Sequence, residues 1–340
     1  MKAMAVTSYS RPLEELDLPE PQLTPGTALL EVLACGVCFS DVKTSRGHMP
    51  FSEELALPHI PGHEICGRVL ETDPPGAVEA GTRVVAHHYS PCGRCARCRA
   101  GDENLCTNLR AWMGFTHNGG FAERVVVPLD RLLPIPDSVE TLSAGPMTCA
   151  LGTAYRAVVT RGDVAAGIRV ALIGLGGVGI HAAQIARHAG AEVVGIDRSE
   201  RALEVARGLG IDARDADDGG IEEMAPDGFD VVIDNVGRTE TLERAAELAR
   251  PGGRVVGVGY AQGQRLSVET PRFVLGELEF VGSRYVARDE LERAIRLVAG
   301  GHVQIVVDAV RPLAEVNEVF GQLEGGELVG RAVLDVAGVT

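Results

Sequence analysis

The chain has 340 residues, a formal net charge of −15, and hydrophobic and charged fractions of 45% and 23%. This length is greater than one hydrophobic core usually supports, so we expect two folded domains. The negative charge repels phosphate backbones and anionic lipid, and no basic cluster offsets it, which argues against binding to nucleic acid or to membrane surfaces.

The first ten residues lack the cationic start and apolar core of a signal peptide. No apolar run approaches the roughly 18 residues that cross a bilayer. We therefore expect a cytoplasmic protein. Because cytosolic thiols stay reduced, the eight cysteines indicate metal binding more than a disulfide framework.

Short β-type runs separated by Gly, Pro and polar clusters follow one another from Thr27 to about Pro136. Such runs are typical of an antiparallel β domain. The predicted strands are Leu29–Leu33, Gly67–Leu70, Arg83–Ala86 and Ala122–Val127.

From about Gly167 the pattern changes to apolar strands that alternate with amphipathic helices. The predicted strands are Ile168–Ile173, Glu192–Ile196, Phe229–Asp234, Arg254–Val258 and Leu278–Val281. The predicted helices are Val178–His188, Glu200–Leu209 and Thr239–Ala249. This alternation predicts a parallel sheet with right-handed crossovers.

The carboxyl-terminal part carries no further nucleotide-binding signal, and we expect it to return to the first domain. Its predicted elements are a helix over Asp289–Val298, a strand over Val306–Val310, a helix over Leu313–Leu323 and a strand over Gly330–Val336. The predicted fold class is α/β: a doubly wound Rossmann domain over 151–284 beside a β-rich domain built from 1–150 and 285–340.

Four cysteines stand close together in a Gly- and Arg-rich stretch with the spacing C-x2-C-x2-C-x7-C: Cys92, Cys95, Cys98 and Cys106. Four thiolates in one short loop suit tetrahedral zinc. Similar spacings also hold iron–sulfur clusters, so the motif alone does not fix the metal. A four-cysteine zinc site keeps no open position, so we expect a structural ion in a lobe over 92–106.

A glycine fingerprint follows the strand that ends at Ile173 and opens a helix, and its residues are Gly174, Gly176, Gly177, Val178 and Gly179. The glycines permit the tight turn, the approach of the pyrophosphate and close helix packing. Asp197 ends the next strand, where a carboxylate binds ribose hydroxyls and repels a 2′-phosphate. We therefore predict NAD, while Arg198 beside it keeps NADP possible.

Three further segments point to a family. Gly36–Asp41, Gly62–Glu64 and Cys149–Tyr155 resemble the zinc-ligand segments of medium-chain zinc-dependent alcohol dehydrogenases, and the four-cysteine lobe and the fingerprint stand in the family's order. The resemblance covers essentially the whole chain. It implies a GroES-like catalytic domain, and a catalytic zinc held by Cys38, His63 and Cys149 with an open position for substrate oxygen.

The resemblance also implies roles for neighbouring residues. Glu64 is a possible extra zinc ligand, with a salt bridge beside the site as the alternative. Asp41 is expected to accept the second ring N–H of His63, or else to cap a loop. Ser40 resembles the first proton-relay group. Lys43 stands where the family often has histidine; it relays protons, contacts cofactor phosphate or is solvated.

Two more expectations come from the resemblance. Arg331 resembles an arginine that contacts the cofactor pyrophosphate, or is an ordinary strand charge. His88, Tyr89, and Trp112 or Phe115 are expected near the substrate, or else in the core of the domain. Cys35 and Cys66 fall outside the ligand pattern and are expected to be core thiols.

The sequence therefore predicts a zinc-dependent, NAD-linked alcohol dehydrogenase with two zinc ions per chain, acting on a small alcohol or carbonyl, with a secondary alcohol or polyol favoured. An NADPH-linked reductase of carbonyls or activated double bonds is one alternative, and a non-catalytic nucleotide-binding protein is another. The resemblance implies a homodimer or homotetramer. No nucleic-acid or membrane partner is expected.

Overall fold

The chain folds as two compact units in a computed structural model that describes residues 1–339. Unit 1 consists of residues 1–149, 287–299 and 307 onward, and unit 2 consists of residues 150–286 and 300–306. The sequence predicted an unbroken return to the first domain over 285–340. The structure differs at 300–306, because side chains of His181 and Gln184 bind this stretch within unit 2.

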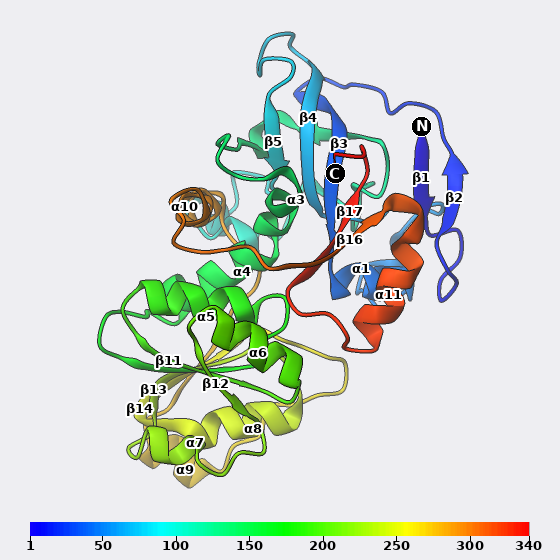
Figure 1. Ribbon diagram of the computed structural model, residues 1–340. Coiled ribbons are helices and arrows are strands. Elements are labelled where there is room, and N and C mark those ends of the chain that lie inside the picture. The colour runs from blue at the N-terminus through cyan, green and yellow to red at the C-terminus, as the bar shows by residue number, and fades with distance from the viewer. Residues whose placement is uncertain (340) are drawn as a thin grey trace. The chain divides into compact units, whose positions relative to one another are not determined.

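Unit 1 is built on a seven-stranded sheet (Figure 1). The strands lie in the order β16 (Val307–Pro312), β17 (Arg331–Asp335), β3 (Thr27–Val37), β4 (Glu64–Thr72), β5 (Arg83–Ala86) and β9 (Leu132–Pro134), and β8 (Arg124–Pro128) also pairs with β3. Neighbours are antiparallel except β16 and β17. The chain's last two strands therefore complete the sheet that its first half begins.

Smaller elements surround this sheet. Two short antiparallel pairs are β1 (Lys2–Ala5) with β2 (Glu14–Asp17) and β6 (Tyr89–Ser90) with β7 (Ala111–Trp112). The helices of unit 1 include α1 (Phe39–Ser45), α2 (Ala96–Arg99), α3 (Thr141–Ala144), α10 (Arg288–Ala299) and α11 (Val316–Glu324). The predicted helix over Leu313–Leu323 thus starts three residues later, after a 3-10 turn at Leu313–Glu315.

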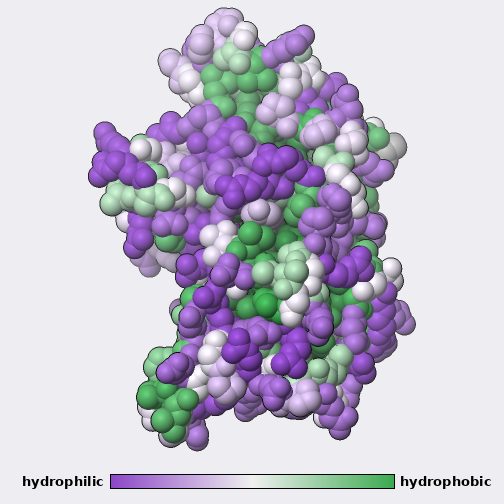
Figure 2. Space-filling model, turned by 90° about the vertical axis from the view of Figure 1, so that its left-hand side faces the viewer, coloured by the Kyte–Doolittle hydropathy of each residue, from purple (hydrophilic) through white to green (hydrophobic). Residues whose placement is uncertain are grey.

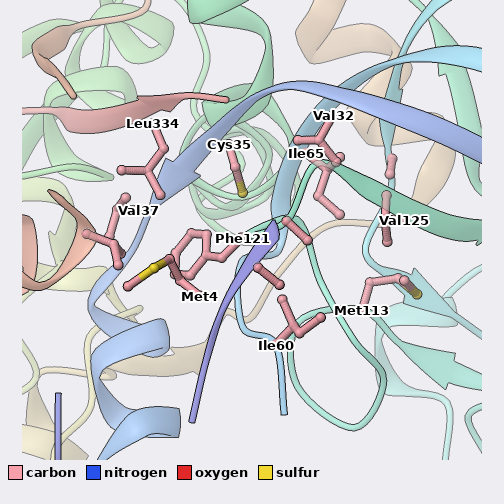
Figure 3. Close-up of a cluster of buried hydrophobic side chains, with 14 of the residues drawn as sticks. Met4, Val32, Cys35, Val37, Ile60, Ile65, Met113, Phe121, Val125 and Leu334 are labelled. Atoms are coloured by element: carbon pink, nitrogen blue, oxygen red, sulfur yellow. The ribbon is translucent and has the colours of Figure 1, made fainter. Parts of the chain in front are cut away.

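The core of unit 1 gathers apolar side chains from β3 and from segments far apart in the sequence. In Figure 3, Met4, Val37 and Leu334 lie around Phe121, and Phe121 is fully buried. Fully burying one such side chain stabilises a fold by about 1.5–3 kcal/mol. Cys35 belongs to the same cluster and is also fully buried, so its expected role as a core thiol is confirmed.

Unit 2 contains a six-stranded parallel sheet. Its order is β12 (Asp212–Asp215), β11 (Glu192–Asp197), β10 (Arg169–Ile173), β13 (Phe229–Asp234), β14 (Ala249–Gly257) and β15 (Glu279–Gly282). In order of appearance this is 3-2-1-4-5-6, the doubly wound arrangement that binds dinucleotides where the order reverses. The predicted fold class is confirmed. The sequence missed β12, a four-residue edge strand with three charged side chains.

Helices cover both faces of this sheet. Figure 1 shows α5 (Gly179–His188) and α6 (Glu200–Gly208) on one face, with α7 (Ile221–Met224), α8 (Thr239–Leu248) and α9 (Thr270–Leu275) on the other. The sequence predicted α5 and α8 to within one residue at each end. It missed α4 (Ala150–Tyr155), which continues as a π-helical turn over Arg156–Arg161.

Figure 2 shows one face on which hydrophilic residues predominate and hydrophobic patches are separate. Among residues 1–339, no helix is both long and apolar enough to cross a membrane.

Candidate metal and cofactor sites

The four cysteines of the lobe converge as the spacing predicted. Cys95 caps the short helix α2, and its sulfur lies 3.4 Å from that of Cys98 and 3.9 Å from that of Cys106. The sulfurs of Cys92 and Cys98 are 3.9 Å apart. Tetrahedral zinc with bonds of about 2.3 Å separates its sulfurs by roughly 3.8 Å, so these four thiols fit the ion.

Backbone amides of the lobe point at the sulfur atoms. The N–H groups of Cys92 and Asn108 donate to Cys106, at 3.3 and 3.4 Å, and that of Cys98 donates to Cys95 at 3.5 Å. Such bonds favour the thiolate. The backbone N–H of Cys98 is the main cause that lowers the pKa of Cys95 to about 6, whereas burial raises the pKa of Cys98 to about 12. The backbone around Cys95 therefore favours a negative sulfur.

Strand register brings the second group of ligands together. Gly36 of β3 pairs with Glu64 of β4, so Cys38 just past the end of β3 lies beside His63 just before β4. Cys149 follows the turn Gly145–Thr148, and a Cβ on Gly145 would collide with the carbonyl oxygen of Glu64. Tertiary packing thus unites residues that lie far apart in the sequence.

The ligand atoms of Cys38, His63, Glu64 and Cys149 all lie within 4.8 Å of one another, and all four residues are buried. Nε2 of His63 is buried without a hydrogen-bond partner among the described residues. An unpaired buried nitrogen is costly unless something binds it. Two thiols, an imidazole and a carboxylate are ligands that zinc takes, so this cluster also fits the ion.

Asp41 holds His63 from the side away from the other ligands. Its Oδ1 is 2.9 Å from Nδ1 of His63, and the carboxylate also accepts N–H groups from Cys38, at 2.9 Å, and Gly62, at 3.2 Å. The sequence left two roles open for Asp41, and both occur: it contacts the imidazole of His63 and it caps α1. Nδ1 carries the proton toward Asp41, which leaves Nε2 for a metal.

The groups around His63 raise the pKa of its imidazole. Burial lowers the pKa of the imidazole, but Asp41 and Cys38 outweigh it and raise the pKa well above the usual value. A hydrogen bond from Cys149 lowers the pKa of the Cys38 thiol and raises that of Cys149. A metal ion at this site would bind both sulfurs as thiolates.

Arg331 lies at this cluster, a contact that the sequence analysis did not foresee. Ala332 of β17 pairs with Val37 of β3, which places Arg331 opposite Cys38. The guanidinium donates to Glu64 at 2.9 Å and to the sulfur of Cys38 at 3.6 Å, and it is almost fully buried. The expected contact of Arg331 with the cofactor pyrophosphate stays a prediction.

Glu64 is held in a salt bridge, which was one of its two predicted roles. Burial raises the pKa of its carboxyl to about 7, and Arg331 opposes that rise. The second oxygen, Oε2, is buried without a hydrogen-bond partner among the described residues. Oε1 of Glu64 therefore accepts a hydrogen bond from Arg331, while Oε2 has no such partner among the described residues and belongs to a carboxylate close to the thiols.

Helix α1 carries the two candidate relay residues. Ser40 is half-buried in its first turn. Lys43 is also half-buried, and burial lowers the pKa of its amine although the Cys38 thiolate opposes this. Its Nζ lies 5.8 Å from the ring centre of Phe39. The sequence left open that Lys43 is a solvated surface lysine, but in the structure its side chain is half-buried.

An aromatic cluster adjoins His63. The ring of Phe115 lies 4.6 Å from that of His63 and 4.6 Å from that of Trp112, and His88 lies 5.2 Å from His63. These residues were predicted from resemblance. The sequence missed Phe51, whose ring packs 5.3 Å from Trp112, because it stands in a loop without any motif.

In unit 2 the fingerprint forms the predicted turn between β10 and α5. Gly174 has a φ of +86°, which favours glycine, and a Cβ on Gly179 would collide with the carbonyl oxygen of Gly174. A Cβ on Gly176 would meet only open space, so the backbone is accessible there. Asn235, at the end of β13, donates to the Gly174 carbonyl at 3.3 Å.

Asp197 lies at the end of β11, as predicted. Its carboxylate accepts the N–H of Leu175 at 2.6 Å and that of Ser199 at 2.9 Å. A cavity of about 410 Å³ opens beside it, lined by residues that include Gly174, Asp197, Arg198, Val236, Arg238 and Arg244. The carboxylate is thus fixed in the lining of this cavity, which three arginines also line.

Two family models match the chain. The alcohol dehydrogenase GroES-like domain matches residues 24–137, and the zinc-binding dehydrogenase domain matches residues 177–300. Among curated proteins, an alcohol dehydrogenase of Geobacillus stearothermophilus is 34% identical over 99% of this chain and 100% of its own length.

Solved structures give the same result. A structure named as an NAD-dependent alcohol dehydrogenase is 29% identical, covers 99% of this chain and 100% of its own, and superposes with a TM-score of 0.93. A zinc-binding dehydrogenase of Sinorhizobium meliloti, named as bound to NADP, is 30% identical, with a TM-score of 0.90 and coverage of 98% and 99%.

Proposed function

The chain belongs to the zinc-dependent alcohol dehydrogenase family of medium-chain dehydrogenases, and we propose that it interconverts an alcohol and its carbonyl with NAD. The observation that carries this proposal is the buried convergence of Cys38, His63 and Cys149, with Nε2 of His63 left unpartnered. The curated relatives are named as alcohol dehydrogenases, and two similar solved structures are named as NAD-dependent or as bound to NADP.

Cys38, His63 and Cys149 would hold the catalytic zinc, and Cys92, Cys95, Cys98 and Cys106 the structural zinc. Bound at the first site, zinc supplies a Lewis acid that lowers the pKa of an alcohol or polarises a carbonyl, and NAD supplies the hydride acceptor. Asp41 orients the imidazole. Arg331 binds one oxygen of Glu64 and so limits how far that carboxylate can approach the ligands.

Proton transfer needs a path from the buried site to solvent. Ser40 and Lys43 stand on the same helix, three residues apart, so their side chains project from neighbouring positions of one helix face. Ser40 would take the proton of the alcohol. Lys43, with its lowered pKa, would pass that proton outward.

Asp197 supports NAD over NADP. Its carboxylate is locked by two backbone N–H groups and cannot turn away from a 2′-phosphate, which it would repel. Arg198 and Arg238 line the same cavity and are the groups that would favour NADP. Asp197→Ala, which removes the repulsion, should therefore improve kcat/KM with NADP relative to NAD by about tenfold or more.

The aromatic residues beside His63 favour an alcohol with an apolar substituent. Phe51 and Trp112 are partly exposed, and Phe115 joins them to the imidazole. We propose a secondary alcohol as substrate, with a polyol as the alternative to be tested.

A homodimer or homotetramer is also proposed. Strand β15 ends the sheet of unit 2, and within residues 1–339 it pairs on one side only, with β14. Helix α9, which precedes it, exposes Phe273, Val274 and Leu275, the last at 82%. Burying apolar side chains next to a strand edge favours association. Light scattering should show an oligomer, and Leu275→Glu should shift it toward the monomer.

Metal analysis combined with a substrate screen tests the proposed function. We expect about two zinc ions per chain and turnover of secondary alcohols with NAD that chelation abolishes. Cys38→Ser should fold and lose turnover. Normal turnover in that variant would contradict the catalytic zinc. Reduction of activated double bonds with NADPH, without alcohol turnover, would favour the reductase alternative instead.

A further inference from the structure

His181 links the glycine turn of unit 2 to the segment 300–306. It lies in the first turn of α5 and is fully buried. Its Nδ1 is 2.8 Å from the carbonyl oxygen of Gly177, and its Nε2 is 3.1 Å from the backbone nitrogen of Val306. One imidazole therefore contacts both the fingerprint and a segment more than a hundred residues away in the sequence.

The two partners fix the tautomer of this imidazole. A carbonyl oxygen only accepts, so Nδ1 carries the proton and donates to Gly177. A backbone N–H only donates, so Nε2 is unprotonated and accepts from Val306. The neutral imidazole is thus bonded at both nitrogens.

The bond to Gly177 acts on the group that faces the cofactor. The carbonyl of Gly177 and the N–H of Val178 belong to one planar trans peptide and point in opposite directions. Fixing the carbonyl therefore fixes the N–H. Val178 immediately precedes α5, and N–H groups at a helix start bind phosphate.

The segment at the other end of His181 is tethered a second time. Gln184, one turn further along α5, donates to the Gln304 carbonyl at 3.0 Å and accepts the Gln304 N–H at 2.8 Å. Within α5 it contacts Ile180, not the glycine turn. Gln184 makes two hydrogen bonds to the segment and His181 makes one, but of the two side chains His181 also bonds to the fingerprint.

We propose that His181 is a positioning residue for the dinucleotide: it ties the glycine turn to segment 300–306 and so holds the Val178 N–H toward the pyrophosphate. His181 acts through the Gly177 peptide without touching the cofactor. This inference rests on the proposed function, in which the glycine turn binds NAD.

ADP-ribose is a suitable probe, because it carries the adenosine and the pyrophosphate but no nicotinamide. Its dissociation constant, measured by calorimetry, depends on neither turnover nor the catalytic metal. Adenosine, which has no phosphate, is the control ligand for effects that do not depend on the pyrophosphate. In His181→Phe we expect the Kd for ADP-ribose to rise about tenfold while that for adenosine stays within about twofold.

Matched variants separate positioning from general stability. Gln184→Leu cuts the other tether and should lower the melting temperature as His181→Phe does, yet leave the Kd for ADP-ribose unchanged. His181→Gln keeps a donor and an acceptor and should restore most of the affinity. If the Phe ring is not accommodated, His181→Leu, with a smaller side chain, takes its place.

Kinetics should agree with the binding measurements. His181→Phe should raise KM for NAD while kcat at saturating NAD stays near that of the wild type. An unchanged Kd for ADP-ribose in His181→Phe and His181→Leu, or an equal loss of affinity in Gln184→Leu, would overturn the inference. Failure of the wild-type chain to bind ADP-ribose would overturn the proposed function itself, and this inference with it.

Discussion

The two metal clusters of unit 1 differ in how the chain makes them. The cysteines of the lobe come from residues 92–106, and Cys92, Cys95 and Cys98 are partly exposed. The second cluster takes Cys38, His63 and Cys149 from three distant segments and buries all of them. A site made by one loop depends on spacing, whereas a site made by several segments depends on strand register.

The surroundings of the two clusters differ as well. Backbone N–H groups surround the lobe sulfurs, while Asp41, Glu64 and Arg331, all buried, surround the second cluster. Burying charged groups costs stability unless they are paired. In the second cluster Asp41 is paired with His63 and Arg331 with Glu64, whereas Nε2 of His63 and Oε2 of Glu64 have no hydrogen-bond partner among the described residues. Chemistry is expected at that cluster and structural support from the lobe.

The largest effect should follow loss of a buried ligand. Cys149→Ala should reduce turnover by about a thousandfold or more, because the metal's several kcal/mol of transition-state stabilisation are lost. Zinc content should fall from about two ions per chain to one, with little change in melting temperature. Cys66→Ala, a buried thiol outside both clusters, is the control and should keep both ions and the activity.

A lobe variant should show the opposite pattern. Cys95→Ser should also lose about one zinc ion per chain, but it should lower the melting temperature by several degrees or more and leave kcat of the folded enzyme within about threefold. Metal analysis, calorimetry and active-site titration measure the three quantities. If folded Cys95→Ser were as inactive as Cys149→Ala, the division of roles between the clusters would be wrong.

An intermediate effect is expected at Asp41. Asp41→Asn keeps the size of the side chain but removes the charge that holds Nδ1 of His63, so zinc affinity at the buried site should fall about 10- to 100-fold. Added zinc should recover much of the activity. When Asp41→Asn is titrated with a chelator, the zinc of the buried site should be released while the zinc of the four-cysteine lobe is retained. Release of both ions together would show that the clusters are not independent.

The smallest effect concerns pH. Burial lowers the pKa of Lys43, so its neutral form, which accepts the proton, becomes available at lower pH than for a solvated lysine. Alcohol oxidation should therefore rise with pH as Lys43 loses its proton. Lys43→Arg stays charged and should lose that rise, at a cost of about three- to tenfold near the optimum. An unchanged pH–rate profile would remove the relay role.

Local patterns were read from the sequence with good accuracy. The strands Arg83–Ala86 and Phe229–Asp234 were predicted with the bounds that the structure has, because both are short apolar runs between clear turn signals. Strand β12 was missed because its residues, Asp212–Asp215, are mostly charged and follow no apolar alternation. Helix α4 was missed because it is short and all six of its residues are buried, so it lacks the apolar–polar periodicity that signals a helix.

The buried cluster could be predicted only in part. Resemblance supplied its ligands, and the family membership is confirmed. Nothing in the sequence placed Arg331 against Glu64 and Cys38, since that contact follows from the pairing of β17 with β3. The role of His181 was equally hidden, because one of its partners is Val306, whose position depends on the return of the chain.

The sequence by itself determined what depends on neighbours along the chain: the cysteine spacing of the lobe, the glycine turn, the alternation of strand and helix, and the carboxylate of Asp197 at a strand end. Only the tertiary structure decided what depends on distant segments: the closing of Cys38, His63 and Cys149 into one site, the place of Arg331 in it, and the tether made by His181. The physical reason is that strand register and packing bring distant backbone segments together: a one-residue shift of β17 against β3, for example, would turn Arg331 to the other face of the sheet.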